Sequence, residues 1–194
     1  MRTVAVFDFD KTLSTRDNVM PFLSHVVGTR RLAAALVVLS PRLAAAALLD
    51  KRRNAAKTAL VRRLLAGSDD AGMTAQGEQF AAEIVARHLR PEAVERVEWH
   101  RGQGHELVIV SASFSHYVKP VGRALGFAAV LATELEVGPD GRLTGGLRGE
   151  NVRRAEKVRR LDAWLGDRPA FVWAYGDSKG DRELFARADR AVRV

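Results

Sequence analysis

The sequence predicts an α/β fold with a central parallel sheet and a large helical insertion. Short apolar runs, several of them rich in β-branched residues, are typical of buried strands and occur at Thr3–Phe7, Leu107–Val110, Ala128–Leu131 and Ala170–Ala174. Helical patterns follow at Tyr117–Leu125 and Glu156–Leu165. Strands that alternate with helices indicate parallel strands joined by right-handed crossovers.

The segment between the first two strands carries only helical patterns. We expect helices at Val19–Val27, Arg31–Leu39, Arg42–Leu65, Ala75–Arg87 and Pro91–Gln103. Pro41 is expected to separate two of them, and Pro91 suits the first position of the last. Because this block is too long for a single crossover, it predicts a helical cap at 15–103. The α/β core would then consist of residues 1–14 and 104–194.

A turn signal marks a further element after the third strand. The sequence Gly138-Pro139-Asp140-Gly141 lies between Glu134–Val137 and Arg142–Thr144, which predicts a β-hairpin within Thr133–Gly149 appended to the core. The residues leading to Val194 are expected to form another strand.

Composition excludes several classes of protein. The 194 residues are 47% hydrophobic and 28% charged, a balance typical of a globular domain and not of a disordered chain. The absence of cysteine excludes disulfides, thiolate metal sites and a cysteine nucleophile. No Walker loop or dinucleotide-binding glycine pattern is present. The first residues lead into a strand and not into a secretory signal, so we expect a cytoplasmic protein.

Polar side chains follow the predicted strands at the points where they end. Asp8 and Asp10 follow the first strand, Ser111 follows the second, and Asp177 and Asp181 follow the last. The carboxyl ends of parallel strands meet at one edge of a sheet, so these side chains should converge. Clustered carboxylates repel one another unless a cation lies among them. Oxygen ligands without histidine or cysteine favour Mg²⁺.

These residues form four motifs in order along the chain: Asp8-x-Asp10-x-Thr12, Ser111, Lys157 at a helix start, and Gly176-Asp177-Ser178-x-x-Asp181. Over essentially its full length the sequence resembles the haloacid dehalogenase (HAD) superfamily of phosphatases. It resembles in particular the phosphoserine-phosphatase-like branch, subfamily IB, with a helical C1-type cap. The resemblance implies a three-layer, Rossmann-like core and a phosphoric monoester hydrolase.

The resemblance also implies a role for each motif residue. Asp8 would be the nucleophile that forms an aspartyl-phosphate, and Asp10 the general acid and base. Mg²⁺ would be held by Asp8, the carbonyl oxygen of Asp10, Asp177 and Asp181, the last directly or through water. The phosphate would be bound by Ser111, Lys157 and backbone N–H groups at Phe9 and Asp10, and Thr12 would support the loop.

The substrate is expected to be a small phosphorylated metabolite. Asp17 lies where phosphoserine phosphatases carry a glutamate that meets the substrate amine, and it could instead be a helix N-terminal charge. Ser111-Ala112-Ser113 departs from the serine and two glycines of those enzymes. Their cap arginine, which meets the substrate carboxylate, has no unambiguous counterpart, and the candidates are Lys57, Arg62 and Arg63. Phosphoserine specificity therefore stays open.

The sequence allows several interpretations of what the cap segment 30–53 contacts. Basic residues cluster between Arg30 and Arg63, where only Asp50 opposes them, and the whole chain has a net charge of +8. Leu32–Leu49 is apolar apart from Ser40-Pro41-Arg42. It could pack in the cap's own core, form a homodimer interface, or contact an anionic membrane as in phosphatidylglycerophosphate phosphatases. A nucleic-acid-binding module is disfavoured because no aromatic residues interleave with the basic ones.

Overall fold

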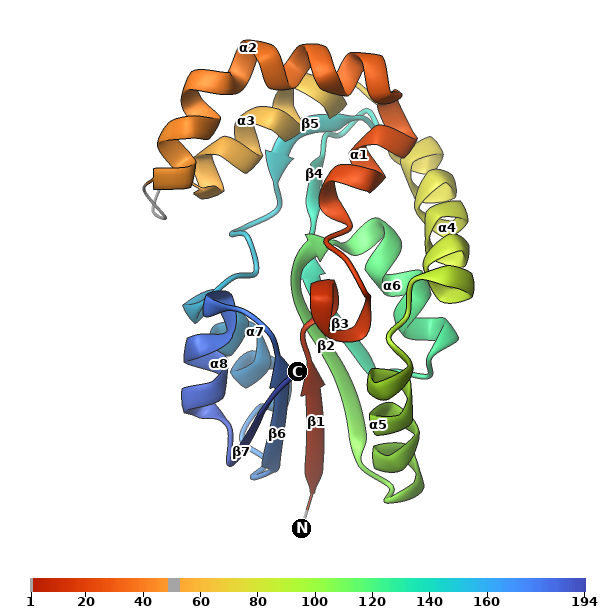
Figure 1. Ribbon diagram of the computed structural model, residues 1–194, viewed down its shortest axis with the longest axis vertical. Coiled ribbons are helices and arrows are strands. Elements are labelled where there is room, and N and C mark those ends of the chain that lie inside the picture. The colour runs from red at the N-terminus through yellow and green to blue at the C-terminus, as the bar shows by residue number, and fades with distance from the viewer. Residues whose placement is uncertain (1, 49–52) are drawn as a thin grey trace.

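The computed structural model describes residues 2–48 and 53–194 and contains a five-stranded parallel sheet (Figure 1). The sheet has the order β3-β2-β1-β6-β7. Its strands are β1 (Thr3–Phe7), β2 (Glu106–Phe114), β3 (Ala129–Thr133), β6 (Phe171–Gly176) and β7 (Arg190–Arg193). All neighbouring strands pair in parallel, and all four predicted strands are confirmed.

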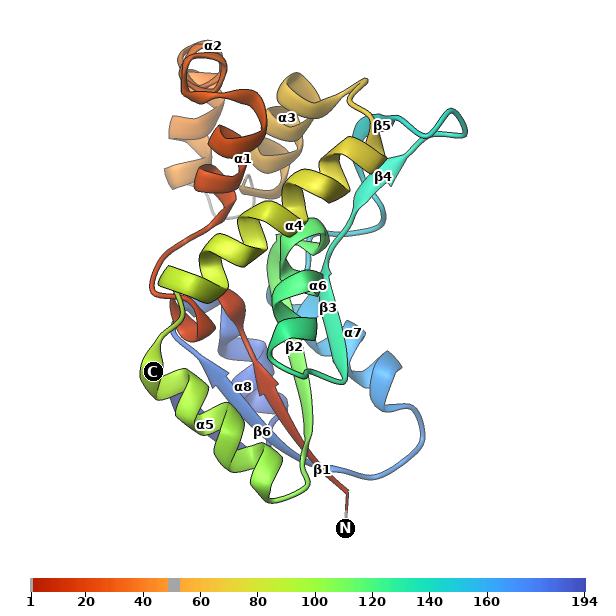
Figure 2. The same cartoon turned by 90° about the vertical axis from the view of Figure 1, so that its right-hand side faces the viewer.

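The sheet is covered on both faces, which confirms the predicted three-layer core. Alternate residues of β1 enter different apolar clusters, because successive side chains of a strand point to opposite faces. Ala5 and Phe7 pack with residues of α5 (Pro91–Gly102) and α6 (Ser115–Ala124). Val4 and Val6 pack with residues of α7 (Ala155–Leu165) and α8 (Arg182–Arg187). Figure 2 shows α5 and α6 in front of the strands.

Three helices lie beyond the carboxyl ends of the strands (Figure 1): α1 (Val19–Val27), α2 (Thr29–Leu48) and α3 (Arg53–Leu65). The fourth inserted helix, α4 (Asp70–Arg87), runs back along α6. The prediction that Pro41 separates two helices is wrong, because α2 continues through it. Pro41 has no N–H, so the helix continues through it without the hydrogen bond to the carbonyl of Val37.

Over residues 32–39 of α2, burial differs from one side of the helix to the other. Leu32, Ala35 and Leu39 are buried, whereas Val37 is 73% and Val38 56% exposed. The expected helix at 42–65 corresponds to the end of α2 and to α3, while 49–52 lie outside the described residues. Among those described, no single helix has the length and apolar character to cross a membrane. The bent pair Val19–Val27 and Thr29–Ser40, which meet at 120°, passes that test of length and composition.

The predicted hairpin is confirmed as β4 (Leu135–Val137) and β5 (Leu143–Leu147), an antiparallel pair. It packs against α3, so it adjoins the cap helices (Figure 1). Gly145 allows this approach: it has a φ of +84°, and a Cβ there would lie 2.7 Å from the Cα of Arg62. Helix α5, within the expected cap range, packs against β2. The boundary between cap and core at residues 103 and 104 stays a prediction.

A buried histidine joins α5 to the sheet. His100 is fully buried, with its Nε2 2.9 Å from the Tyr175 hydroxyl and its Nδ1 2.8 Å from Nδ1 of His105. Burial lowers the pKa of His100 from 6.5 to about 4, helped by His105 and Arg96. The folded protein therefore resists protonation of His100 more than the unfolded chain does.

We predict that this histidine makes folding stability fall in mild acid. The unfolded chain binds the extra proton between pH 6.5 and 4, so the stabilisation is complete above pH 6.5 and is lost as the pH falls towards 4. At pH 5 the loss should be about 2 kcal/mol relative to pH 7.5. Urea unfolding at both pH values checks this, with His100→Gln as the comparison because all other groups are shared. An equal loss in the variant would contradict it.

Candidate active site

Three carboxylates converge at the carboxyl edge of the sheet. Asp8 follows the central strand β1, and Asp177 and Asp181 follow its neighbour β6. Their oxygen atoms lie within 4.8 Å of one another. Asp8 and Asp181 are buried, while Asp177 is partly exposed. The structure thus brings together the acidic residues of the first and fourth motifs.

Lys157 supplies the positive charge inside this cluster. Its Nζ lies 2.6 Å from Oδ1 of Asp8 and 2.5 Å from Oδ1 of Asp181. Burial acts to lower the pKa of Lys157, but the two carboxylates outweigh burial and raise it. Arg159 and Arg160, on the same helix, instead pair with Glu156. Of the basic residues Lys157, Arg159 and Arg160 on α7, it is therefore Lys157 that contacts the carboxylate cluster.

Asp181 is fixed on both of its oxygen atoms. Oδ1 accepts from Lys157, and Oδ2 accepts from the backbone N–H of Ser178 at 3.1 Å and from its hydroxyl at 2.8 Å. Gly176 makes room for this carboxylate, because a Cβ there would lie 2.8 Å from Cγ of Asp181. Asp181 consequently holds Lys157 in place, and Asp8 and Asp177 are the more available carboxylates.

The chain leaves β1 in a tight turn. Phe9–Leu13 form a single π-type turn closed by a 3.0 Å bond from the N–H of Ser14 to the carbonyl of Phe9. Lys11 lies in the left-handed region at φ +58°, and its carbonyl accepts from Arg90 at 2.8 Å. The turn keeps Phe9 beside Asp8, where the Phe9 backbone N–H helps lower the pKa of that carboxyl. Thr12 is buried, and its hydroxyl has no partner among the described residues.

Asp10 lies in this turn, and its carboxylate is held from two sides. Oδ1 accepts from the backbone N–H of Asn18 at 3.0 Å and from its side-chain amide at 2.8 Å. Oδ2 accepts from the Ser113 hydroxyl at 2.5 Å. Burial raises the pKa of Asp10 to about 7, although the bonds from Ser113 and Asn18 act to lower it. A carboxyl group with a pKa near 7 can both give and take a proton at neutral pH.

A cavity of about 380 Å³ opens over these groups. It is lined by Asp8, Asp10, Lys11, Asp17, Ser111, Ala112, Arg153, Lys157, Asp177, Ser178, Lys179 and Gly180. The Ser111 hydroxyl accepts from the N–H of Ser113 at 3.1 Å. Lys11, Arg153 and Lys179 line the cavity without having been predicted as site residues. Their only sequence signal is adjacency to the motifs, since cations beside a phosphate site are otherwise indistinguishable from surface charges.

The cap residues considered for substrate binding lie in different places in the structure. Asp17 lines the cavity, and its Oδ1 also accepts from the N–H of Val19 at 3.0 Å, so it borders the cavity and caps α1. Lys57 on α3 donates to the Ala112 carbonyl and, at 2.8 Å, to Oδ1 of Asn151. Burial lowers the pKa of Lys57 to about 7, partly offset by Asp10 and Asp17.

Arg62 and its neighbour Arg63 are exposed and line a different cavity, beside Leu39. The structure therefore brings Lys57 close to the motif residues, and it places Arg62 elsewhere.

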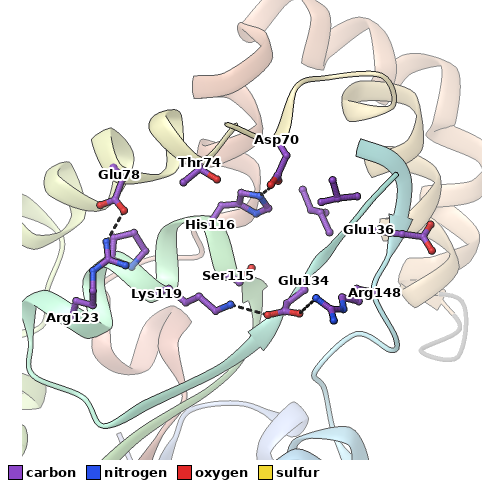
Figure 3. Close-up of a pocket in the computed structure, with 13 residues that line it drawn as sticks. Asp70, Thr74, Glu78, Ser115, His116, Lys119, Arg123, Glu134, Glu136 and Arg148 are labelled. Carbon is purple, nitrogen blue, oxygen red and sulfur yellow. Dashed lines mark hydrogen bonds and ion pairs between the residues drawn. The ribbon is translucent and has the colours of Figure 1, made fainter. Parts of the chain in front are cut away.

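A larger cavity of about 500 Å³ lies between α4, α6 and the hairpin (Figure 3). Several of its charged side chains pair with one another: Asp70 with His116, Glu78 with Arg123, and Glu134 with Lys119 and Arg148. None of the four motifs lines it. The chemistry of the lining residues, and not cavity size, identifies the smaller cavity as the candidate active site.

The donor set of the smaller cavity fits Mg²⁺. Burial raises the pKa of Asp8 to about 6 despite Lys157, and burial together with Asp181 raises that of Asp177. Both shifts are expected where carboxylates outnumber the cations between them. The clustered donors are carboxylate oxygens, with no nitrogen or sulfur ligand, as Mg²⁺ prefers.

Comparison with known proteins agrees with this geometry. The haloacid dehalogenase-like hydrolase family matches residues 5–186. The chain belongs to that family. It is 38% identical over 186 residues to the protein CicA of Caulobacter vibrioides, covering 96% of this chain and 83% of CicA. It is 31% identical over 122 residues to a histidinol-phosphatase of Neisseria meningitidis, covering 60% of this chain and 55% of that enzyme.

Solved structures share the fold. A protein of unknown function from Bordetella pertussis superposes with a TM-score of 0.85 at 27% identity, covering 100% of this chain and 90% of that one. An apo phosphoserine phosphatase superposes with a TM-score of 0.68 at 20% identity, covering 100% and 86%. The predicted HAD-type fold with its phosphoserine-phosphatase-like relationship is confirmed, and the protein is a phosphatase of this family.

We predict that Mg²⁺ stabilises the protein through Asp177. Binding to the folded state alone adds about 2.7 kcal/mol at 100 times the dissociation constant, and Asp177→Asn should remove most of this gain by deleting one anionic ligand. Thermal unfolding with increasing MgCl₂ measures it. Asp162→Asn is the matched control, because Asp162 pairs with Arg187 on the surface. The same Mg²⁺-dependent shift in Asp177→Asn and the unmodified protein would contradict the assignment.

Proposed function

We propose that this chain is a Mg²⁺-dependent phosphomonoester hydrolase that acts through an aspartyl-phosphate on Asp8. The observation that carries the proposal is the position of Asp8, buried beside Lys157 at the floor of the 380 Å³ cavity. Asp10, two residues along the same turn, borders that cavity with a pKa of about 7. A nucleophile, a cation and a proton donor therefore border one space.

In the first step a carboxylate oxygen of Asp8 attacks phosphorus, and the bond from phosphorus to the ester oxygen breaks. Lys157 reduces the repulsion between the two anions, while the Ser111 hydroxyl and the Phe9 N–H bind non-bridging phosphate oxygens. Asp10 gives its proton to the departing oxygen, so the product leaves as a neutral alcohol.

In the second step water replaces the alcohol. Asp10, now ionised, takes a proton from that water, and the oxygen attacks phosphorus. The bond between phosphorus and Asp8 breaks, which releases inorganic phosphate and restores the carboxylate of Asp8. Asp10 is again protonated, so protons balance over the cycle.

Mg²⁺ would be held by Asp8, the carbonyl oxygen of Asp10 and Asp177, with Asp181 contacting it directly or through water. Both oxygen atoms of Asp181 already accept hydrogen bonds, from Lys157 and from Ser178, which favours contact through water. When bound, the ion supplies positive charge that offsets the repulsion between phosphate and carboxylate.

We infer that the substrate is a small phosphorylated metabolite. Asp17 borders the cavity and could pair with an ammonium group, and Lys57 places a partly desolvated cation near Asp10 and Asp17. Phosphoserine and histidinol phosphate both carry an amine, and enzymes acting on them are among the proteins to which this chain is similar. A screen of phosphorylated amines against amine-free phosphates identifies the class, with Asp17→Asn expected to raise KM for amines only.

The mechanism predicts a complete dependence on Asp8. Asp8→Asn should remove Mg²⁺-dependent hydrolysis of p-nitrophenyl phosphate, a loss of at least about 10³-fold, because an amide cannot act as the nucleophile. EDTA should likewise abolish the activity of the unmodified protein. Phosphate release is the assay, with circular dichroism to confirm folding. An active Asp8→Asn protein would rule out the mechanism.

A second candidate, a lipid phosphatase at a membrane surface, is favoured by the exposed side of α2. Val37 and Val38 project from the helix, and Arg30, Arg31, Arg62 and Arg63 are exposed on α2 and α3. Exposed aliphatic side chains together with exposed arginines suit an anionic lipid surface. A cytoplasmic protein would meet such lipids at the inner leaflet. Lys51 and Arg52, also expected in this contact, lie outside the described residues.

If this face binds lipid, the protein should co-sediment with phosphatidylglycerol vesicles at low salt and not with phosphatidylcholine vesicles. Val37→Ser with Val38→Ser should weaken binding roughly tenfold, because the apolar contact is lost. Val85→Ser, an exposed valine on α4, is the control. A dimer that only the paired substitution dissociates would instead identify the face as a homodimer interface and contradict lipid binding.

A further inference from the structure

Hydrogen bonds hold the side chain of Asp10 in one orientation. Among the described residues its three hydrogen-bond donors come from two residues, Asn18 and Ser113. Both residues are fully buried. Asn18 comes from the segment that enters α1, and Ser113 comes from β2, so the two donors approach Asp10 from separate elements.

Asn18 occupies a position where its side chain would ordinarily cap a helix. It is the N-cap residue of α1, yet it makes no side-chain capping bond. The neighbouring Asp17 accepts from the N–H of Val19 instead. The amide of Asn18 turns towards Asp10 and also lies 2.8 Å from the Ser14 hydroxyl and 3.0 Å from the Arg16 carbonyl. The side chain of Asn18 therefore binds Asp10 and makes no capping bond to the start of α1.

Ser113 reaches Asp10 because β2 is irregular at this point. The pairing of β2 with β3 shifts register between Ser111 and Phe114. Such irregularities re-aim side chains beside active sites. Here the N–H of Ser113 donates to the Ser111 hydroxyl, and the hydroxyl of Ser113 donates to Oδ2 of Asp10. One short segment therefore connects a phosphate-binding serine to the proposed proton donor.

We propose that Asn18 and Ser113 are positioning residues that fix the carboxyl group of Asp10 in line with the leaving-group oxygen. This inference rests on the proposed function of Asp10 as general acid. The backbone and side-chain N–H groups of Asn18 occupy Oδ1, and the hydroxyl of Ser113 occupies Oδ2. Removal of either side chain leaves Asp10 able to rotate away, and a displacement of this kind is costly in proton transfer.

The test compares two substrates of nearly equal size. Phenyl phosphate has a basic leaving group that needs a proton, whereas p-nitrophenyl phosphate has a weakly basic one that does not. The ratio of kcat/KM for the two reports phosphoenzyme formation only, so the later role of Asp10 as a base does not enter. Ser113→Ala and Asn18→Ala should each lower kcat/KM for phenyl phosphate roughly 10-fold more than for p-nitrophenyl phosphate.

Three comparisons separate positioning from a general structural effect. Ser113→Thr, which keeps the hydroxyl, should restore the substrate ratio. Ser115→Ala removes another buried serine hydroxyl, one without a bond to Asp10, and should leave the ratio unchanged. In an Asp10→Asn background, adding Ser113→Ala should change the ratio no further, because residues that act through one group are not additive.

An equal fall for both substrates, or no fall for either, would overturn the inference while leaving the phosphatase intact. A further drop of the ratio in the Asp10→Asn background would also overturn it. Asn18→Ala and Ser113→Ala act on different elements, so a folding defect in one leaves the other as the test. An unmodified protein that hydrolyses neither substrate would overturn the proposed function, and the positioning role with it.

Discussion

The contact of one buried ammonium group with two buried carboxylates is the constraint on which the site depends. Nζ of Lys157 lies within 2.6 Å of a carboxylate oxygen of Asp8 and of Asp181, and all three residues are buried. Ions removed from water lose several kcal/mol each unless partners replace the solvent. Lys11, Arg153 and Lys179 also line the cavity, but Lys157 is the cation that contacts Asp8 and Asp181 directly. Burial is the largest cause of the raised pKa of Asp8, and the neighbouring Asp181 adds to it. The three clustered carboxylates are a donor set that suits a divalent cation.

Parallel topology makes this contact possible. β1 lies at the centre of the sheet between β2 and β6, so Asp8 leaves the sheet between the ends of both neighbours. Strand β6 delivers Asp177, and the helix that precedes β6 delivers Lys157. Apolar packing on both faces of β1 fixes the position of Asp8. Lys157 therefore lies on a packed helix, and Asp8 and Asp177 directly follow packed strands, so regular elements bring these charged groups together.

Sequence patterns predicted the core better than the cap, for physical reasons. Fully buried parallel strands are continuous apolar runs, and functional residues follow their ends, so Asp8 and Asp177 could be recognised. The break expected at Pro41 is absent because a proline inside a helix removes one hydrogen bond, and the other bonds of the helix can outweigh that loss. Lys57 and Arg62 lie five residues apart, or about 140° around a helix, and pattern alone cannot tell which side faces the cavity.

Pattern alone is equally ambiguous for Asn18. An asparagine at this position is expected for helix capping and equally for a contact with Asp10, so the sequence cannot tell the two roles apart. Lys57 shows the consequence for function. It reaches from α3 to the Ala112 carbonyl and Asn151, so a cap side chain lies beside the end of β2, which carries Ser111. In the proposed mechanism residues of the core bind the phosphate, whereas Asp17 borders the same cavity and Lys57 lies near enough to Asp10 and Asp17 for their charges to raise its pKa against the effect of burial. On this proposal the reaction is encoded by strand ends, which are regular, and the substrate by cap surfaces, which are not.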